Sequence, residues 1–130
     1  MTAPRALTSS DAPPALGAYS SAVVANGLLF VSGQIGWDRD GRGLAERGPG
    51  EQTAQALRNI ESLLRAAGGS LRDVVKVTVF LDDLASTVEV NAAYEKVMSD
   101  AGVTTLPART MVAAGVPAAV EIDAIAMLAP

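Results

Sequence analysis

The sequence predicts an α+β protein, because strand-like and helix-like segments follow one another in the order ββαβαββ. Three observations support this prediction: an Asn-Gly hairpin signal, two segments with helical spacing of apolar residues, and β-branched runs between and after them. Two helices form one layer, which covers one face of a mixed five-stranded sheet. The 130 residues fit a single domain, and residues 1–16 are expected to form an extended leader.

Five strands are predicted, at Ser21–Ala25, Leu28–Gln34, Val74–Leu81, Ala108–Ala113 and Val120–Leu128. The first two surround Asn26-Gly27, the strongest short signal for a tight hairpin. The third is expected to place Val75, Val77, Val79 and Leu81 on one face. The last two are expected to form a hairpin with a turn near Gly115–Pro117.

Two helices are predicted between these strands. The first covers Glu51–Ala67, where leucine and isoleucine recur with helical spacing, and Gly68-Gly69 ends it. Ser86 and Glu89 have the spacing of a capping box at the start of the second helix. Its apolar stripe is formed by Val90, Ala93, Tyr94, Val97 and Met98.

The last strand has apolar residues on both faces, since Ile125 and Met127 alternate with the apolar residues of the other face. A sheet that is apolar on both faces, with helices for only one, needs a partner on the second. The sequence therefore predicts a homo-oligomer.

The composition narrows the class of protein. Hydrophobic residues make up 49% and charged residues 18%, which argues against disorder. No apolar run reaches the ~18–20 residues of a membrane span, and the N-terminal residues show no apolar signal core. We therefore expect a cytoplasmic protein without a membrane partner. The net charge of −4 and the scattered arginines also argue against nucleic acid as a partner.

The missing residue types narrow the chemistry. The chain has no Cys and no His, which excludes thiolate nucleophiles and the usual base at neutral pH. The carboxylates lack the spacing of a calcium loop, so no metal is proposed. Any catalysis must come from Arg, Lys, Asp, Glu, Tyr, Ser, Thr and backbone N–H groups.

Charged residues interrupt the two C-terminal apolar runs. Arg109 lies in the first, and Glu121 and Asp123 lie in the second. Because burying an unpaired charge is costly, these groups either neutralise each other or bind a small charged ligand. A guanidinium fork suits a planar carboxylate. A desolvated Glu121 could carry protons near neutral pH without histidine. The spacing alone leaves both alternatives open.

Several segments carry a family resemblance: Gly17-Ala18-Tyr19-Ser20, Phe30-Val31-Ser32-Gly33-Gln34-Ile35, Asp73-Val74-Val75-Lys76, Val90-Asn91, Pro107-Ala108-Arg109-Thr110 and Val120-Glu121-Ile122. In this order they resemble the Rid (RidA/YjgF) family. The resemblance implies a chorismate-mutase-like fold of the bacillus type and a homotrimeric barrel with sites at the subunit interfaces. It also implies cofactor-free hydrolysis of reactive enamines and imines, such as 2-aminoacrylate, to 2-oxo acids and ammonia, by a 2-iminobutanoate/2-iminopropanoate deaminase-like hydrolase.

The resemblance also implies the site residues, and each role is an expectation. Arg109 would bind the substrate carboxylate and Glu121 would handle the water and the proton. Tyr19, expected from a neighbouring chain, would shield the reacting end. Further substrate-binding positions are Ser32, Gly33, Asn91 and Met111.

Two features depart from the family pattern. Met111 stands where members commonly carry Cys, and the chain between Arg109 and Glu121 is shorter than usual. In a hairpin, an odd change of length would turn side chains to the opposite face. Two other functions therefore stay open: a pathway-specific tautomerase, cyclase or imine-handling enzyme that uses the same site, and a non-catalytic trimer that binds small carboxylates. Ribonuclease activity has been attributed to relatives, but an acidic chain without histidine gives it no physical support.

The expected site residues also have structural explanations. Tyr19 could be a half-buried aromatic residue with a solvated hydroxyl. Gly33 could mark a bend in which no side chain fits. Asn91 could be an ordinary polar residue of a helix, and Met111 could fill the core.

Overall fold

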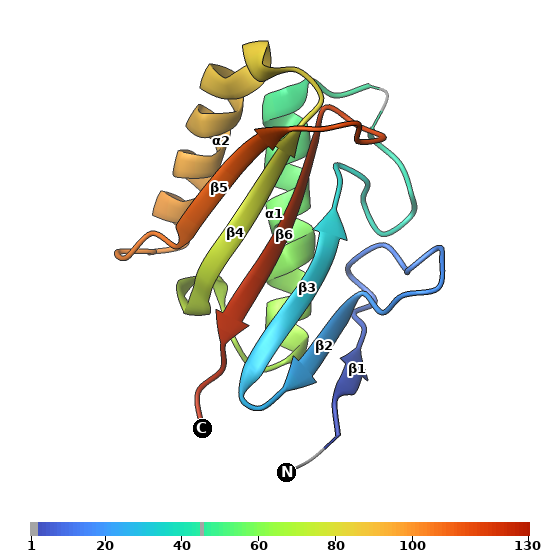
Figure 1. Cartoon of the computed structure of the whole chain (residues 1–130), viewed down its shortest axis with the longest axis vertical. Coiled ribbons are helices and arrows are strands. Elements are labelled where there is room, and N and C mark those ends of the chain that lie inside the picture. The colour runs from blue at the N-terminus through green and yellow to red at the C-terminus, as the bar shows by residue number, and fades with distance from the viewer. Residues whose placement is uncertain (1–2, 45) are drawn as a thin grey trace.

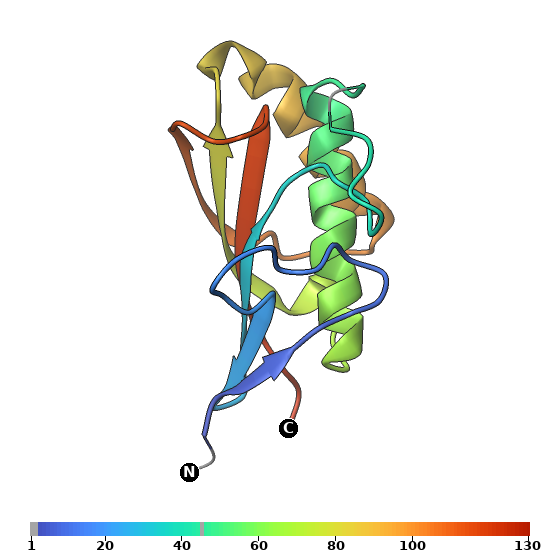
Figure 2. The ribbon, with the colours of Figure 1, turned by 90° about the vertical axis from the view of Figure 1, so that its right-hand side faces the viewer.

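The computed structural model describes residues 3–44 and 46–130, and in them two α-helices cover one face of a six-stranded sheet (Figures 1 and 2). The elements are β1 (Arg5–Leu7), β2 (Ala22–Ala25), β3 (Leu28–Gln34), α1 (Pro49–Ala66), η1 (Leu71–Asp73), β4 (Val74–Leu81), η2 (Leu84–Ser86), α2 (Thr87–Asp100), β5 (Ala108–Ala113) and β6 (Val120–Met127). The strand order is β1-β2-β3-β6-β4-β5. The predicted α+β class is confirmed.

The sheet has one strand more than predicted, because the leader is not only an extended segment. β1 pairs antiparallel with β2, with Arg5 opposite Val24 and Leu7 opposite Ala22. Three residues are too few to show a period of two, so pairing with β2 rather than local pattern makes this strand.

The first hairpin is as predicted. Asn26 has φ of 53° and Gly27 has φ of 76°, the two positive values that a type I′ turn requires. This turn sets the register of β2 on β3, with Ala25 opposite Leu28.

β4 matches its predicted bounds but not its predicted face. Val77, Val79 and Leu81 are buried, whereas Val75 is 44% exposed. The pairing with β6 shifts register between Val74 and Lys76. This irregularity turns Val74 into the core in place of Val75.

The predicted hairpin of the last two strands is wrong. β5 pairs parallel with β4, and β6 pairs antiparallel with the other edge of β4. β4 therefore lies between them, and the 114–119 segment crosses over it. The length of this segment does not set the register of Arg109 against Glu121, because each strand takes its register from β4.

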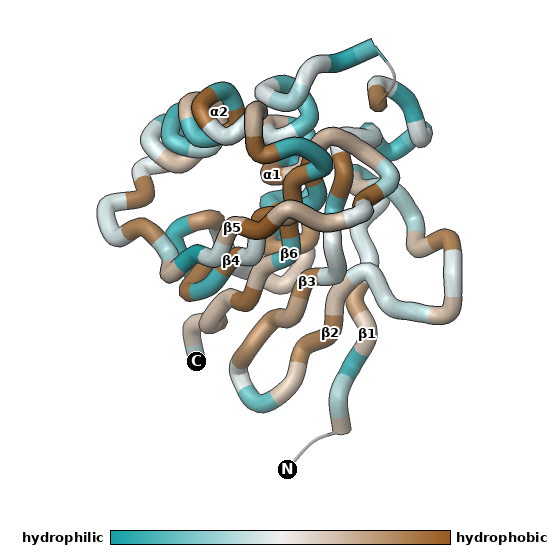
Figure 3. The backbone as a smooth tube through the Cα atoms, turned by 45° about the horizontal axis from the view of Figure 1, so that its top comes forward, coloured by the Kyte–Doolittle hydropathy of each residue, from teal (hydrophilic) through white to brown (hydrophobic). Residues whose placement is uncertain are grey.

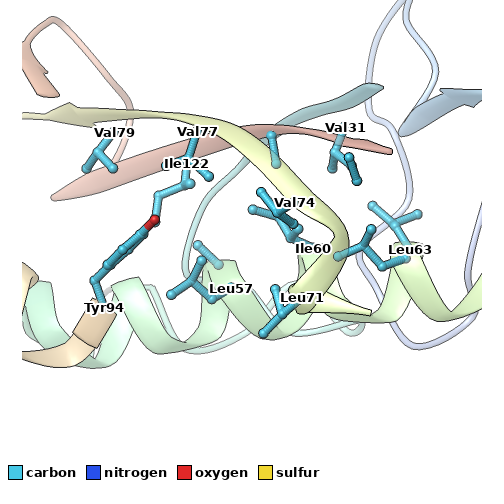
Figure 4. Close-up of a cluster of buried hydrophobic side chains, with 14 of the residues drawn as sticks. Val31, Leu57, Ile60, Leu63, Leu71, Val74, Val77, Val79, Tyr94 and Ile122 are labelled. Atoms are coloured by element: carbon cyan, nitrogen blue, oxygen red, sulfur yellow. The ribbon is translucent and has the colours of Figure 1, made fainter. Parts of the chain in front are cut away.

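Both helices pack their apolar stripes on the sheet. Leu57, Ile60 and Leu63 of α1 meet the buried valines of β4 and Val31 of β3 (Figure 4). α1 starts two residues earlier than predicted, with Pro49 in its first turn, a position that proline favours.

The stripe predicted for α2 packs as expected, but its predicted cap is wrong. Val90, Tyr94 and Met98 are buried. Ser86 makes no side-chain capping bond. Instead Asp83 accepts a hydrogen bond from the N–H of Ala85 (2.9 Å) and starts the short η2 turn that leads into α2.

The face of the sheet without helices carries exposed apolar side chains. Phe30, Val112 and Met127 alternate with residues of the helix-facing side, and Phe30 and Met127 are 41% and 62% exposed. Hydrophobic stretches recur along the strands (Figure 3). Among the described residues, no helix has both the length and the apolar character that a membrane crossing requires.

Candidate active site

Arg109 lies on β5 and faces the helices. Its register partner on β4 is the buried Val77, and partners in a parallel pair point to the same face. The guanidinium carbon of Arg109 lies 4.9 Å from the centroid of the Tyr94 ring on α2. Within the described chain, neither Glu121 nor Asp123 forms an ion pair with Arg109. The arginine is exposed and available to an anion.

A cleft of about 410 Å³ opens beside this guanidinium; we call it the Arg109 cleft. It is lined by Asn91, Tyr94, Glu95, Leu106, Pro107 and Arg109. The side-chain oxygens of Asn91 and Tyr94 are buried and have no hydrogen-bond partner among the described residues. Asn91 precedes Tyr94 by one helical turn, so both residues belong to the same face of α2.

The Tyr94 hydroxyl points towards Val77 and Ile122 of the sheet (Figure 4). Desolvation raises the pKa of Tyr94, and the charge of Arg109 offsets part of that rise. Tyr94 is therefore neutral at physiological pH, and its ring rather than its hydroxyl faces Arg109.

Glu121 lies on β6 and points to the face without helices. It stands between the buried Val120 and Ile122 and opposite Phe80. Desolvation raises the pKa of Glu121, and the negative charge of Asp123 raises it further. Asp123 itself accepts a hydrogen bond from the backbone N–H of Thr78 (3.1 Å), which holds it beside β4.

Gly33 makes room for this glutamate. A Cβ atom built at Gly33 would lie 2.5 Å from Oε2 of Glu121 and 2.8 Å from its Cδ. The pairing of β3 with β6 shifts register between Val31 and Gln34, around this glycine. Gly33 thus lies at the irregularity in β3, and its lack of a side chain leaves space for the carboxylate of Glu121.

A second cavity of about 220 Å³ contains Glu121; we call it the Glu121 cavity. Its lining includes Leu16, Tyr19, Gly33, Ile35, Trp37, Pro117 and Glu121. Glu121 is the only charged residue that lines it among the described residues. Most of its walls are apolar, which agrees with the raised pKa of the glutamate.

Tyr19 lines the Glu121 cavity of its own chain, and it lies outside the Arg109 cleft. Its hydroxyl accepts a weak hydrogen bond from the N–H of Leu16 (3.4 Å), and its ring packs on Gly17. The side chain is 55% exposed, which leaves much of the ring open to a ligand.

Two expected site residues lie outside both cavities. The Ser32 hydroxyl donates to the carbonyl oxygen of Ser20 (2.6 Å) and fastens β3 to the segment before β2. Met111 shares the face of Arg109, opposite Val79, and packs against the core. Sequence reasoning missed Trp37 and Pro117, which the fold brings to Glu121. It also placed Tyr94 only in the core.

One chain holds the two charged groups apart. Their register partners on β4, Val77 and Phe80, are an odd number of positions apart and therefore face opposite sides of the sheet. Arg109 and Glu121 also lie on strands that are separated by β4, about 10 Å in all. They cannot meet on one small ligand within a single chain.

The fold and these two cavities define a class of small α+β proteins. In this chain an exposed arginine and a desolvated glutamate lie on separate surfaces. The family model described as Endoribonuclease L-PSP matches residues 9–128. The chain therefore belongs to this family, which is the Rid (YjgF) family that its motifs resemble.

Relatives match over nearly the whole chain. A rat protein named 2-iminobutanoate/2-iminopropanoate deaminase is 39% identical over 97% of this chain and 91% of its own length. A RutC family protein of Aquifex aeolicus is 37% identical over 95% and 98%.

Solved structures also match over nearly the whole chain. The YjgF gene product of E. coli is 34% identical with a TM-score of 0.89, over 95% of this chain and 98% of that one. E. coli TdcF with bound serine is 29% identical with a TM-score of 0.90, over 96% and 99%.

Proposed function

We propose that this protein is a cofactor-free hydrolase that converts reactive 2-imino acids and their enamine tautomers to 2-oxo acids and ammonia. One observation carries the proposal: Arg109 and Glu121 are both free of ion-pair partners in the described chain and point to opposite faces of the sheet. The names of the rat, human and mouse relatives support the same reaction class.

The proposed assembly is a homotrimer in which the Arg109 cleft of one copy meets the Glu121 cavity of the next. The exposed apolar side chains of the helix-free face support it, because a second copy would remove them from water. In this arrangement Tyr19 and Glu121 come from one chain, and Arg109 and Asn91 come from its neighbour.

In the proposed mechanism Arg109 binds the substrate carboxylate through two charge-assisted hydrogen bonds and orients the imine. An enamine substrate first takes a proton on carbon and becomes the imine. A water held by Glu121 then attacks the carbon of the protonated imine and gives one proton to the glutamate, which leaves a neutral amino alcohol. Glu121 returns that proton to the amino nitrogen. The C–N bond then breaks and releases ammonia, while the hydroxyl loses its proton to Glu121 and becomes the C=O group of the 2-oxo acid.

The environment of Glu121 suits this proton transfer. Burial and the charge of Asp123 raise its pKa, which brings the carboxyl closer to neutral pH. Gly33 leaves room for the carboxylate, and Tyr19 lines the same cavity. Asn91 and Arg109 line the same cleft.

The charge distribution favours a small acid over RNA as the substrate, although the family is described as an endoribonuclease. The net charge is −4, and Glu121 is the charged residue of its cavity. A polyanion would be repelled there, whereas a small acid needs only the one arginine.

The test is 2-oxo acid and ammonia formation from 2-aminoacrylate or 2-iminobutanoate generated in situ. The protein should accelerate both, and Arg109→Ala should lower kcat/KM by at least about 100-fold, since two charge-assisted hydrogen bonds are lost. Glu121→Gln should lower kcat by about 100- to 10,000-fold. A protein that binds 2-oxobutanoate but leaves hydrolysis at the rate in buffer would instead be a carboxylate-binding protein.

A further inference from the structure

We infer that Tyr94 is a positioning residue for Arg109: the face of its ring holds the guanidinium so that the nitrogen fork points into the Arg109 cleft. This inference rests on the proposed function, because it explains how that arginine is prepared for a carboxylate. The ring and the guanidinium belong to the same chain, so the arrangement exists before any partner or substrate arrives.

The geometry fits a cation–π contact. The guanidinium carbon lies 4.9 Å from the ring centroid, within the range in which a cation is attracted to an aromatic face. Such a contact uses the flat face of the guanidinium and leaves its in-plane N–H donors free. An ion pair with an acidic side chain would instead occupy those donors, and no such pair is formed within the described chain.

The ring of Tyr94 is held rigidly in the core, whereas the side chain of Arg109 is free to move. Tyr94 is 5% exposed and packs in the core near Val77, Val79 and Ile122 (Figure 4). Arg109 is exposed at the edge strand. A flexible side chain loses rotamer freedom when it binds, and a fixed ring beside it reduces that loss. The ring therefore favours carboxylate binding without touching the carboxylate.

The ring and the hydroxyl of Tyr94 can be separated experimentally. The hydroxyl is buried without a hydrogen-bond partner among the described residues, so it contributes nothing favourable to the contact with Arg109. Tyr94→Phe keeps the ring, and Tyr94→Leu and Tyr94→Met keep apolar volume without it. Met98→Ala is a matched control, because it removes buried volume from the same stripe of α2 away from the Arg109 cleft.

The experiment measures 2-oxobutanoate binding by calorimetry and KM and kcat for in situ 2-iminobutanoate. Tyr94→Leu and Tyr94→Met should weaken binding by about five- to thirty-fold. The loss should appear mainly in KM, and the acid limb of the kcat pH profile should stay where it is in the wild type, because the group that titrates there is Glu121 of the neighbouring copy, whose surroundings are unchanged. Tyr94→Phe should retain the affinity through its ring, and Met98→Ala should lower stability without this loss.

A second measurement does not need activity. A double-mutant cycle of Tyr94→Leu and Arg109→Ala, followed by urea unfolding, should show a favourable coupling between the two side chains. The inference is overturned if the coupling is zero, or if Tyr94→Leu binds 2-oxobutanoate as well as Tyr94→Phe. If the wild-type protein neither binds 2-oxobutanoate nor accelerates hydrolysis, the proposed function fails, and the unfolding cycle alone decides whether the ring holds the arginine.

Discussion

The carboxylate of Glu121 lies directly over Gly33, where a Cβ atom would come within 2.5 Å of Oε2. Two strands that are distant in the sequence, β3 and β6, create this contact. Because Gly33 has no side chain, the carboxylate of Glu121, the proposed proton carrier, can occupy this position.

Gly33→Ala should displace the Glu121 carboxylate and lower kcat by about 10- to 100-fold, because a small misplacement of a reacting group is costly. The clash falls on the far end of a flexible side chain, so the unfolding free energy should change by less than about 1 kcal/mol. Gly115→Ala is the control, since a Cβ there meets nothing within 4 Å. If both variants had the same kcat, Gly33 would have no part in positioning the carboxylate of Glu121.

Asp123→Asn should shift the pH profile. Glu121 must be deprotonated to accept a proton from water, so activity should rise with pH through the pKa of Glu121, which lies above its ordinary value of 4.5. The charge of Asp123 contributes to that rise. Asn removes the charge and can still accept the hydrogen bond from Thr78, so the acid limb should move to lower pH. An unmoved limb in the kcat profile would show that another group titrates.

Co-expression of Arg109→Ala and Glu121→Gln chains should restore activity if the site is shared between copies. In trimers mixed at random from equal amounts, about a quarter of the interfaces join an intact arginine to an intact glutamate. Activity should therefore reach about a quarter of the wild-type value, far above either variant alone. Mixed trimers that stay inactive would contradict a shared site, and separately purified variants assayed side by side are the control.

Phe30→Glu should dissociate the assembly. Phe30 is 41% exposed on the helix-free face, and a charge buried there at each subunit contact would cost several kcal/mol. Sedimentation should show single chains, and hydrolysis should fall with the loss of assembly. Val88→Glu is the control, because Val88 is 81% exposed on the outer side of α2. Dissociation by the control alone would place the interface on the helices.

The features that sequence could predict depend on short-range rules. The turn at Asn26-Gly27 needs two positive φ values, which this pair tolerates, and so its hairpin follows from local chemistry. The stripe of α2 follows from helical spacing, and it correctly buries Tyr94 and Met98. The family motifs likewise identified Arg109 and Glu121 as candidate site residues.

The features that sequence could not predict depend on which strands pair. β5 and β6 are adjacent in the chain and were expected to form a hairpin, but both pair with β4. The register shift next to Val75 and the strand Arg5–Leu7 arise in the same way, from partners far along the chain. The local pattern of apolar and polar residues does not specify which distant strands will pair.

By itself, the sequence determined the α+β class, the hairpin, the two helical stripes and the charged residues available for chemistry. Only the tertiary structure decided that Arg109 and Glu121 face opposite sides of the sheet, that Glu121 rests on Gly33, and that Arg109 lies over the ring of Tyr94. The physical reason is that the face and neighbours of a strand residue are set by the pairing of strands, and pairing is a property of the whole sheet.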